Sequence, residues 1–146
     1  MSNVMRNQMT RVGCGAAIIK DGKILLIQRR RPPEAGHWGI PGGKVDWMEP
    51  IEQAVRREIL EEVQLTLKDI ELLGVVDQLD KAEHDHWIAV VYKAITLVGT
   101  PRLCEPEKHA NMQWFDLRNL PHPITLVTKK ILPVLLNSCT SKLHYK

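Results

Sequence analysis

Three glutamates in the middle of the chain have a spacing that suits a shared ligand site. Glu61 and Glu62 follow Glu58 by three and four residues, and residues at these separations project from the same side of an α-helix. Half-buried carboxylates packed side by side repel one another and lose hydration, so a cation should neutralise them. Grouped carboxylate oxygens suit Mg²⁺ or Mn²⁺, ions that also bind substrate phosphates. The alternative is a solvated acidic helix face, for which the same spacing is common.

The sequence around these glutamates predicts a helix from Pro50 to about Val63. Proline is favoured in the first helical turn. An apolar stripe at helical spacing follows it and consists of Ile51, Ala54, Val55 and Ile59. Glu58 and Glu62 project into the same sector as this stripe, and Glu61 lies at its edge. Acids normally lie opposite an apolar stripe, so this placement favours a ligand site.

A glycine pair, Gly42-Gly43, comes shortly before the predicted helix. Glycine lets the backbone approach a ligand closely, and a backbone carbonyl at this place could join the metal ligands. A simple turn is the usual meaning of the sequence Pro-Gly-Gly when it occurs alone. The acids that follow the pair make the ligand site the better interpretation.

Residues 43–65 closely resemble the Nudix box, G-x5-E-x7-R-E-U-x-E-E-x-G-U, in which U is aliphatic. The matching residues are Gly43, Glu49, Arg57, Glu58, Ile59, Glu61, Glu62 and Leu65. One position departs from the motif, because the late glycine is Gln64 here. Residues 37–44 are similar to the strand that leads into that box. Within the family, the chain resembles the small MutT-like nucleotide pyrophosphohydrolases.

The resemblance implies a role for each matching polar residue. The helix acids and one backbone carbonyl would bind Mg²⁺ or Mn²⁺: Glu58, Glu61, Glu62 and the carbonyl of Gly43. Arg57 and Glu49 would form a salt bridge that orients the metal-binding acids. Many members supply another carboxylate from a late segment, and Glu107 is the residue predicted to do so here. A charged surface loop is the alternative for that segment.

The implied reaction is the hydrolysis of a nucleoside diphosphate that is linked to another moiety. Water attacks a phosphorus of the pyrophosphate bridge, while metal ions polarise the phosphoryl oxygens and stabilise the leaving group. Either Glu58 or Glu61 would accept the proton from water, and the sequence leaves both open.

Two further residues are predicted to contact the substrate. Arg30 matches an arginine that can meet substrate phosphates in MutT-like members, a role that the forked guanidinium group suits. The alternative is a solvated basic loop. Trp38, the second of these residues, could stack on a base, but tryptophan is also common in cores, and a place in the core or the pocket wall is favoured for it.

We expect a small nucleotide as the substrate. The prediction is a nucleoside or deoxynucleoside triphosphate, hydrolysed to the monophosphate and pyrophosphate. ADP-ribose or another sugar-linked nucleoside diphosphate is the alternative with the same chemistry. A non-catalytic nucleotide-binding Nudix module is a different class, but such modules commonly lack box carboxylates that this chain has. A capped-RNA hydrolase would need a larger basic patch than residues 29–31 provide.

The elements that must position these residues alternate between strands and helices. The expected strands are 12–20, 23–29, two short ones within 38–45, 70–79, 87–98 and 112–117. The first two are joined by a hairpin turn at Asp21-Gly22. A closing helix is expected over 124–137, with Pro133 as a kink or a new first turn. The order predicts an α/β fold, and the resemblance implies an α/β/α sandwich with a mixed central sheet.

Length and composition fit one such domain. The chain has 146 residues and a formal net charge of +3, so we predict a single domain over 1–146 with residues 1–9 as a loose leader. So small a positive excess predicts no stable nucleic-acid complex. No apolar run approaches the ~20 residues of a membrane-spanning helix. Three widely spaced cysteines favour reduced thiols and a cytoplasmic location, and we expect a monomer or a homodimer.

The departure at Gln64 concerns the end of the helix. The family's glycine would suit a helix C-terminus in the left-handed region. Glutamine can adopt this conformation at a cost of roughly 1 kcal/mol. No metal ligand is lost, so the departure affects local stability far more than catalysis.

Overall fold

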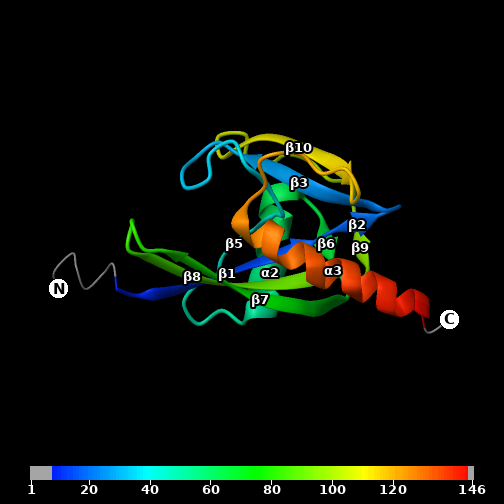
Figure 1. Cartoon of the computed structure of the whole chain (residues 1–146), viewed down its shortest axis with the longest axis horizontal. Coiled ribbons are helices and arrows are strands. Elements are labelled where there is room, and N and C mark those ends of the chain that lie inside the picture. Colours follow the sequence, from blue (N-terminus) through cyan, green and yellow to red (C-terminus); the bar gives the residue numbers. More distant parts are fainter. Residues whose placement is uncertain (1–7, 145–146) are drawn as a thin grey trace.

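The computed structural model describes residues 8–144, with side chains up to residue 138. Figure 1 shows its strands and helices in chain order. The strands are β1 (Thr10–Ala17), β2 (Ile19–Lys20), β3 (Lys23–Arg29), β4 (Trp38–Gly39), β5 (Gly42–Lys44), β6 (Thr66–Leu67), β7 (Ile70–Asp80), β8 (Asp85–Ala94), β9 (Leu97–Val98) and β10 (His109–Asp116). The helices are α2 (Ile51–Val63) and α3 (Leu126–His144). Neither described helix is long and apolar enough to cross a membrane.

The strands form two main sheets and a short ribbon. The first sheet has the order β5-β1-β8-β7, and the second has the order β10-β3-β2, with β4 also paired to β3. Strands β6 and β9 form the ribbon. Strands β1 and β8 run parallel, whereas β5 and β7 are antiparallel to their neighbours. The first sheet is therefore mixed, as predicted.

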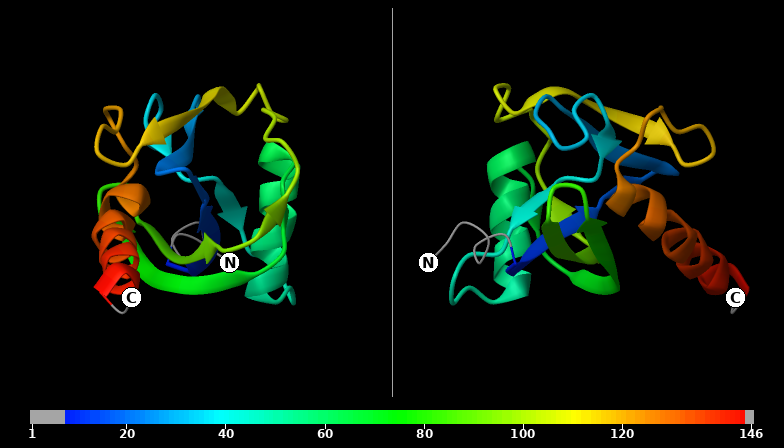
Figure 2. Two further views of the ribbon diagram at one scale, coloured as in Figure 1. Left: turned by 90° about the vertical axis from the view of Figure 1, so that its right-hand side faces the viewer. Right: turned by 60° about the vertical axis from the view of Figure 1, so that its left-hand side comes forward.

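The two helices lie on opposite sides of the strands, as the left view of Figure 2 shows. Helix α2 packs on β1 and β5, and helix α3 packs on β7 and β8. The predicted α/β/α sandwich is confirmed. This arrangement fixes one face of α2 against β5, the strand that contains the glycine pair.

The core explains why α2 is held firmly. Its fully buried residues Val55, Ile59 and Val63 belong to one cluster with Ala16 of β1 and Leu25 of β3. Burying each large aliphatic side chain stabilises the fold by about 1.5–3 kcal/mol. Helix α3 covers the opposite face through buried residues that include Ile131 and Leu135. The backbone from which the polar side chains of the inner face of α2 project is therefore fixed in position.

Several boundaries differ from the predicted ones. The last strand begins at His109 rather than Met112, and the predicted strand 12–20 is divided at Ile18. Helix α3 continues to His144, with Pro133 inside it. Proline removes one helical hydrogen bond, and burial of apolar side chains on both sides of Pro133 offsets this loss. Of the predicted leader, residues 1–7 lie outside the described residues.

Helix α2 ends in the left-handed conformation that the glycine of the box would adopt, although glutamine occupies this position here. Gln64 is the C-cap residue, with φ 59° and ψ 30° in the left-handed region. Its backbone N–H donates to the carbonyl of Leu60 at 3.1 Å. A residue with a Cβ is strained in this region, so glutamine costs stability here while the helix still ends in the usual way.

We predict that Gln64→Gly raises the free energy of unfolding by up to about 1 kcal/mol, because glycine relieves left-handed strain. Thermal and urea unfolding measure this change. Gln53→Gly on the exposed side of the same helix is the matched control and should lower stability by about 1 kcal/mol. A loss of stability in Gln64→Gly would contradict this account of the cap.

Candidate active site

Glu62 is an acid buried between helix α2 and strand β5, with 5% of its surface exposed. Its Oε2 accepts a hydrogen bond from the N–H of Gly42 at 3.3 Å. The Nε2 of His109 lies 4.0 Å from the same oxygen. Burial, together with a smaller contribution from the charge of Glu58, raises the pKa of Glu62 to about 8. An ionised carboxylate is costly in such surroundings, so the structure favours a cation beside it.

The glycine pair lets β5 lie directly against its neighbours. A Cβ on Gly42 would overlap the backbone of Cys14 and Gly15 on β1. A Cβ on Gly43 would overlap the carboxyl group of Glu58. Burial raises the pKa of Glu58, and the hydrogen bond from Arg57 opposes that rise. Both glycines are required by close approach, and together they bring the main chain of β5 into contact with the helix acids.

Arg57 ties helix α2 to the loop before it. Its guanidinium donates two hydrogen bonds to the carboxylate of Glu49, from Nε to Oε2 at 2.8 Å and from Nη2 to Oε1 at 2.9 Å. The bidentate geometry is the strong form of this pair, and it lowers the pKa of Glu49. The same Nη2 donates to the carbonyl of Lys44 at 3.0 Å and lies 3.4 Å from Asp46 Oδ2. The loop is therefore fastened to the middle of the helix.

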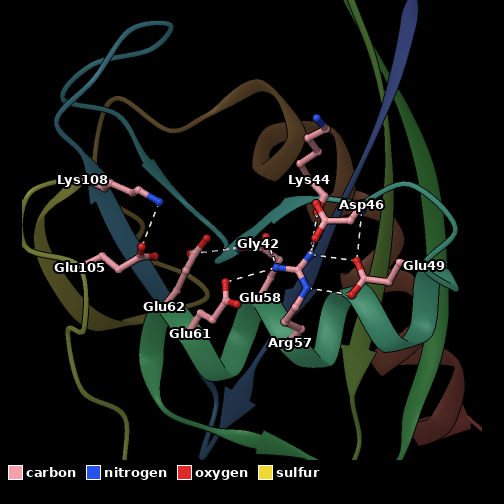
Figure 3. Close-up of polar contacts among 10 residues, drawn as sticks. All are labelled: Gly42, Lys44, Asp46, Glu49, Arg57, Glu58, Glu61, Glu62, Glu105 and Lys108. Atoms are coloured by element: carbon pink, nitrogen blue, oxygen red, sulfur yellow. Dashed lines mark hydrogen bonds and ion pairs between the residues drawn. The ribbon is translucent and has the colours of Figure 1, made fainter.

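The other arm of Arg57 reaches two of the three helix acids (Figure 3). Nη1 donates to Glu58 Oε1 at 2.8 Å and to Glu61 Oε2 at 3.2 Å. Glu58 is largely covered, whereas the side chain of Glu61 is 53% exposed. Arg57 thus neutralises part of the charge of Glu58 and Glu61, and it leaves Glu62 without an arginine partner.

The carboxylates of Glu58, Glu61 and Glu62 are of the chemical type that binds a divalent cation, but their present conformation does not form a complete metal site. Carboxylate and carbonyl oxygens are the ligands that Mg²⁺ and Mn²⁺ prefer, and the buried charge of Glu62 calls for a cation. Among the described residues, no three His, Cys, Asp or Glu side chains are arranged to hold a metal ion as they stand. Arg57 explains this, because it draws Glu58 and Glu61 towards itself.

A turn after Cys104 brings a fourth acid, Glu105, close to the helix acids (Figure 3). The N–H groups of Lys108 and His109 both donate to the carbonyl of Glu105 at 3.0 Å. The Glu105 carboxylate lies 2.9 Å from Lys108 Nζ, and its charge contributes to the raised pKa of Glu62.

The late acid near the site is thus Glu105, where we expected Glu107. Glu107 is exposed. The two acids flank Pro106 in the sequence, and only the direction of the turn decides which of them faces helix α2. The metal-binding role of Glu107 stays a prediction, and Glu105 is the acid of this turn whose charge acts on Glu62.

The two predicted substrate-contacting residues differ in their placement. Arg30 is exposed, and its Nε donates to the carbonyl of Pro106 at 2.7 Å, next to Glu105. Trp38 is only 9% exposed, and its ring packs edge-on against Phe115 with centroids 4.8 Å apart. Trp38 therefore lies in the core, one of the two positions favoured for it, and a contact between Trp38 and the substrate stays a prediction.

Sequence reasoning missed three residues of this cluster. Asp46 is a surface residue, with 62% of its side chain exposed, and it was not predicted to lie beside Arg57 as it does. Glu105 and His109 were overlooked, although both belong to the charged segment that was expected to supply a late acid. Their separation of four residues was the available signal, because a tight turn brings such residues together.

Comparisons with known proteins show the family of the chain. A model of the NUDIX domain matches residues 9–135. The chain is 40% identical over 110 residues to a Methanocaldococcus jannaschii protein named ADP-ribose pyrophosphatase, covering 75% of this chain and 64% of that protein. It is 33% identical over 104 residues to a Danio rerio oxidized purine nucleoside triphosphate hydrolase, covering 71% of this chain and 65% of that protein.

A crystal structure of a MutT NUDIX hydrolase from Burkholderia pseudomallei superposes with a TM-score of 0.84 and 54% sequence identity. That match covers 86% of this chain and 97% of the other. The chain spans just under two thirds of the length of the first two curated relatives. The match to the domain model over most of the chain, together with the box residues on α2, shows that this chain belongs to the Nudix family.

Proposed function

We propose that this protein is a divalent-metal-dependent pyrophosphohydrolase that cleaves a nucleoside or deoxynucleoside triphosphate into the monophosphate and pyrophosphate. The observation that carries the proposal is the burial of Glu62, 5% exposed, beside Glu58 and the glycine pair. A fold that buries two neighbouring carboxylates loses stability unless a cation joins them. Mg²⁺ or Mn²⁺ would join these acids to the phosphates of the substrate.

The proposed metal ligands are the carbonyl of Gly43 and the carboxylates of Glu58, Glu61, Glu62 and Glu105. The bound metal would polarise phosphoryl oxygens, lower the pKa of bound water and stabilise the leaving oxygen. Glu105 takes the role that we first gave to Glu107, because it is the late acid beside Glu62. The proposal needs Glu58 and Glu61 to turn away from Arg57, which a rotation of exposed and half-buried side chains allows.

Arg57 and Glu49 are proposed as positioning residues. Their two hydrogen bonds leave Nη1 of Arg57 directed at the helix acids. When a cation replaces Nη1 beside Glu58 and Glu61, the pair with Glu49 still holds Arg57 in place. The loop and the helix therefore keep their relative position while the acids change partner.

The proposed reaction balances with water as the only second reactant. The oxygen of water forms a bond to a phosphorus of the pyrophosphate bridge, and the bond from that phosphorus to the bridging oxygen breaks. The bridging oxygen leaves with the electron pair. Glu58 or Glu61 accepts the proton of water. Arg30, exposed beside the turn that contains Glu105, is placed to bind an outer phosphate through its remaining N–H groups.

A second candidate substrate is ADP-ribose. The 40% identical relative is named ADP-ribose pyrophosphatase, and the bond cleaved would be the same phosphoanhydride. The acids of α2 do not distinguish the two substrates, because they would act only at the pyrophosphate bridge, which both substrates contain. The choice depends on the nucleoside and sugar contacts.

A substrate panel tests the proposed function directly. Purified protein with Mg²⁺ or Mn²⁺ is incubated with nucleoside triphosphates, deoxynucleoside triphosphates, ADP-ribose, dinucleotides and capped RNA, and the products are separated by chromatography. We expect monophosphate and pyrophosphate from a triphosphate. Preferred release of AMP and ribose 5-phosphate from ADP-ribose would favour the second candidate. Absence of turnover with every substrate, while a nucleotide still binds, would favour the non-catalytic module.

Glu62→Gln should separate stability from metal binding. The folded-state pKa of Glu62 is raised from 4.5 to about 8, so metal-free wild-type protein should lose stability as pH rises from about 4.5 to about 8. Glutamine removes this loss, and metal-free Glu62→Gln should be the more stable protein at pH 8. Added Mg²⁺ should raise the melting temperature of wild-type protein far more than that of the variant. If the two proteins were equally stable across this pH range, ionisation of buried Glu62 would not be what destabilises the wild-type protein, and the prediction would be wrong.

The Arg57–Glu49 pair should act as one unit in catalysis. Glu49→Gln and Arg57→Lys each lose the bidentate bond, and each should lower kcat by about 10- to 100-fold, the range measured when groups that orient ligands are removed. The double variant should be little worse than either single variant. Additive losses in steady-state kinetics would show that the two residues act separately.

A further inference from the structure

His109 lies beside Glu62, and neither the box nor the proposed metal ligands include it. It is 7% exposed, and its Nε2 lies 4.0 Å from Glu62 Oε2. Its other ring nitrogen, Nδ1, is buried and has no hydrogen-bond partner within residues 8–144. The imidazole therefore has one nitrogen that faces Glu62 and one that contacts nothing polar.

Burial of the imidazole in these surroundings is unfavourable unless Nε2 forms a stabilising interaction. Leaving a buried polar atom unpaired costs about 1–3 kcal/mol. An apolar side chain of similar size at this position would avoid that cost. An interaction of Nε2 with Glu62 best explains why residue 109 is a histidine. Among the residues that the structure describes, the Glu62 carboxylate has no arginine or lysine partner at hydrogen-bond distance.

The backbone around His109 directs the ring at helix α2. The N–H of His109 donates to the carbonyl of Glu105 at 3.0 Å, which closes the turn before β10. The pairing of β10 with β3 then shifts register between His109 and Asn111. Bulges of this kind re-aim a side chain and are frequent beside active sites. The start of β10 is built so that residue 109 faces Glu62.

The contacts of Glu62 are confined to one of its two oxygens. Both the N–H of Gly42 and the ring of His109 approach Oε2. Within the described part of the chain, Oε1 makes no hydrogen bond or ion pair. One oxygen is therefore held by the protein from two sides, and the other is left for a ligand.

We propose that His109 is a positioning residue that donates its Nε2 proton to Glu62 Oε2 and so presents Oε1 to the divalent cation. The inference rests on the proposed function and adds a residue that the Nudix box does not contain. The separation of 4.0 Å exceeds a hydrogen bond, and a shift of about 1 Å closes it. Partners that orient metal-binding carboxylates typically change metal affinity by about 10- to 100-fold when removed.

The test compares three substitutions by their Mn²⁺ affinity, measured by electron paramagnetic resonance on metal-stripped protein without substrate. His109→Gln keeps an N–H near the place of Nε2, whereas His109→Asn keeps one near the place of Nδ1. His109→Leu keeps neither. We expect Leu and Asn to weaken Mn²⁺ binding about 10- to 100-fold and Gln to restore most of the affinity.

Two controls separate positioning from folding. Leu135→Ala removes a fully buried side chain of α3, and it should lower the melting temperature without changing Mn²⁺ affinity. In a Glu62→Gln background, His109→Leu should cause no further loss of affinity, because His109 acts only through Glu62. Long-range ¹H–¹⁵N spectra should show the proton of His109 on Nε2.

The outcomes distinguish this inference from the proposed function. Wild-type protein that binds no Mn²⁺ would overturn both. Wild-type protein that binds Mn²⁺, together with a His109→Leu variant that binds it equally tightly, would overturn only the positioning role. Equal losses in the Gln, Asn and Leu variants would also overturn it, because a structural role does not depend on where the N–H lies.

Discussion

The buried carboxylate of Glu62 is the constraint on which the rest of the site depends. It is 5% exposed, a backbone N–H donates to its Oε2, and a buried imidazole lies beside the same oxygen. Burial raises its pKa to about 8, so its ionised form costs stability in the folded protein unless a cation lies beside it. The packing of α2 on β1 and β5 supplies the stability that keeps this charge in place.

Arg57 offsets part of the negative charge of the site. Its guanidinium shares hydrogen bonds among Glu49, Glu58 and Glu61, so one positive charge serves three carboxylates, and Glu62 makes no hydrogen bond with it. A cation that enters would take over two of these acids, while Glu49 keeps the arginine from moving. The pair of Arg57 and Glu49 thus fastens the loop before α2 to the middle of the helix, and it also positions the acids for the proposed chemistry.

The sequence predicted the parts of the site that lie on one helix, because helical spacing determines which side chains share a face. The sandwich with its mixed sheet was implied by the resemblance to the family, and the left-handed conformation of Gln64 was expected from the glycine that the box has at this position. The late acid could not be assigned, since Glu105 and Glu107 differ only in the direction of a turn. His109 was missed because a register shift in β10 directs it, and no local pattern reveals such a shift.

Trp38 and helix α3 show a second limit. Tryptophan suits both a core and a base-binding surface, and only the contact with Phe115 on another strand decides between them. Pro133 led us to expect an interrupted helix, but the helix continues through it. In both cases tertiary packing decided the outcome that local preference left open.

The central claim is that the face of α2 next to β5 binds a divalent cation through its buried acid. A crystal structure of the protein soaked in Mn²⁺, with anomalous diffraction to locate the metal, tests this claim most directly. The account predicts an anomalous peak about 2.0–2.2 Å from a carboxylate oxygen of Glu62, with Glu58 released from Arg57. A peak elsewhere, or no peak with Glu58 still bonded to Arg57, would contradict it.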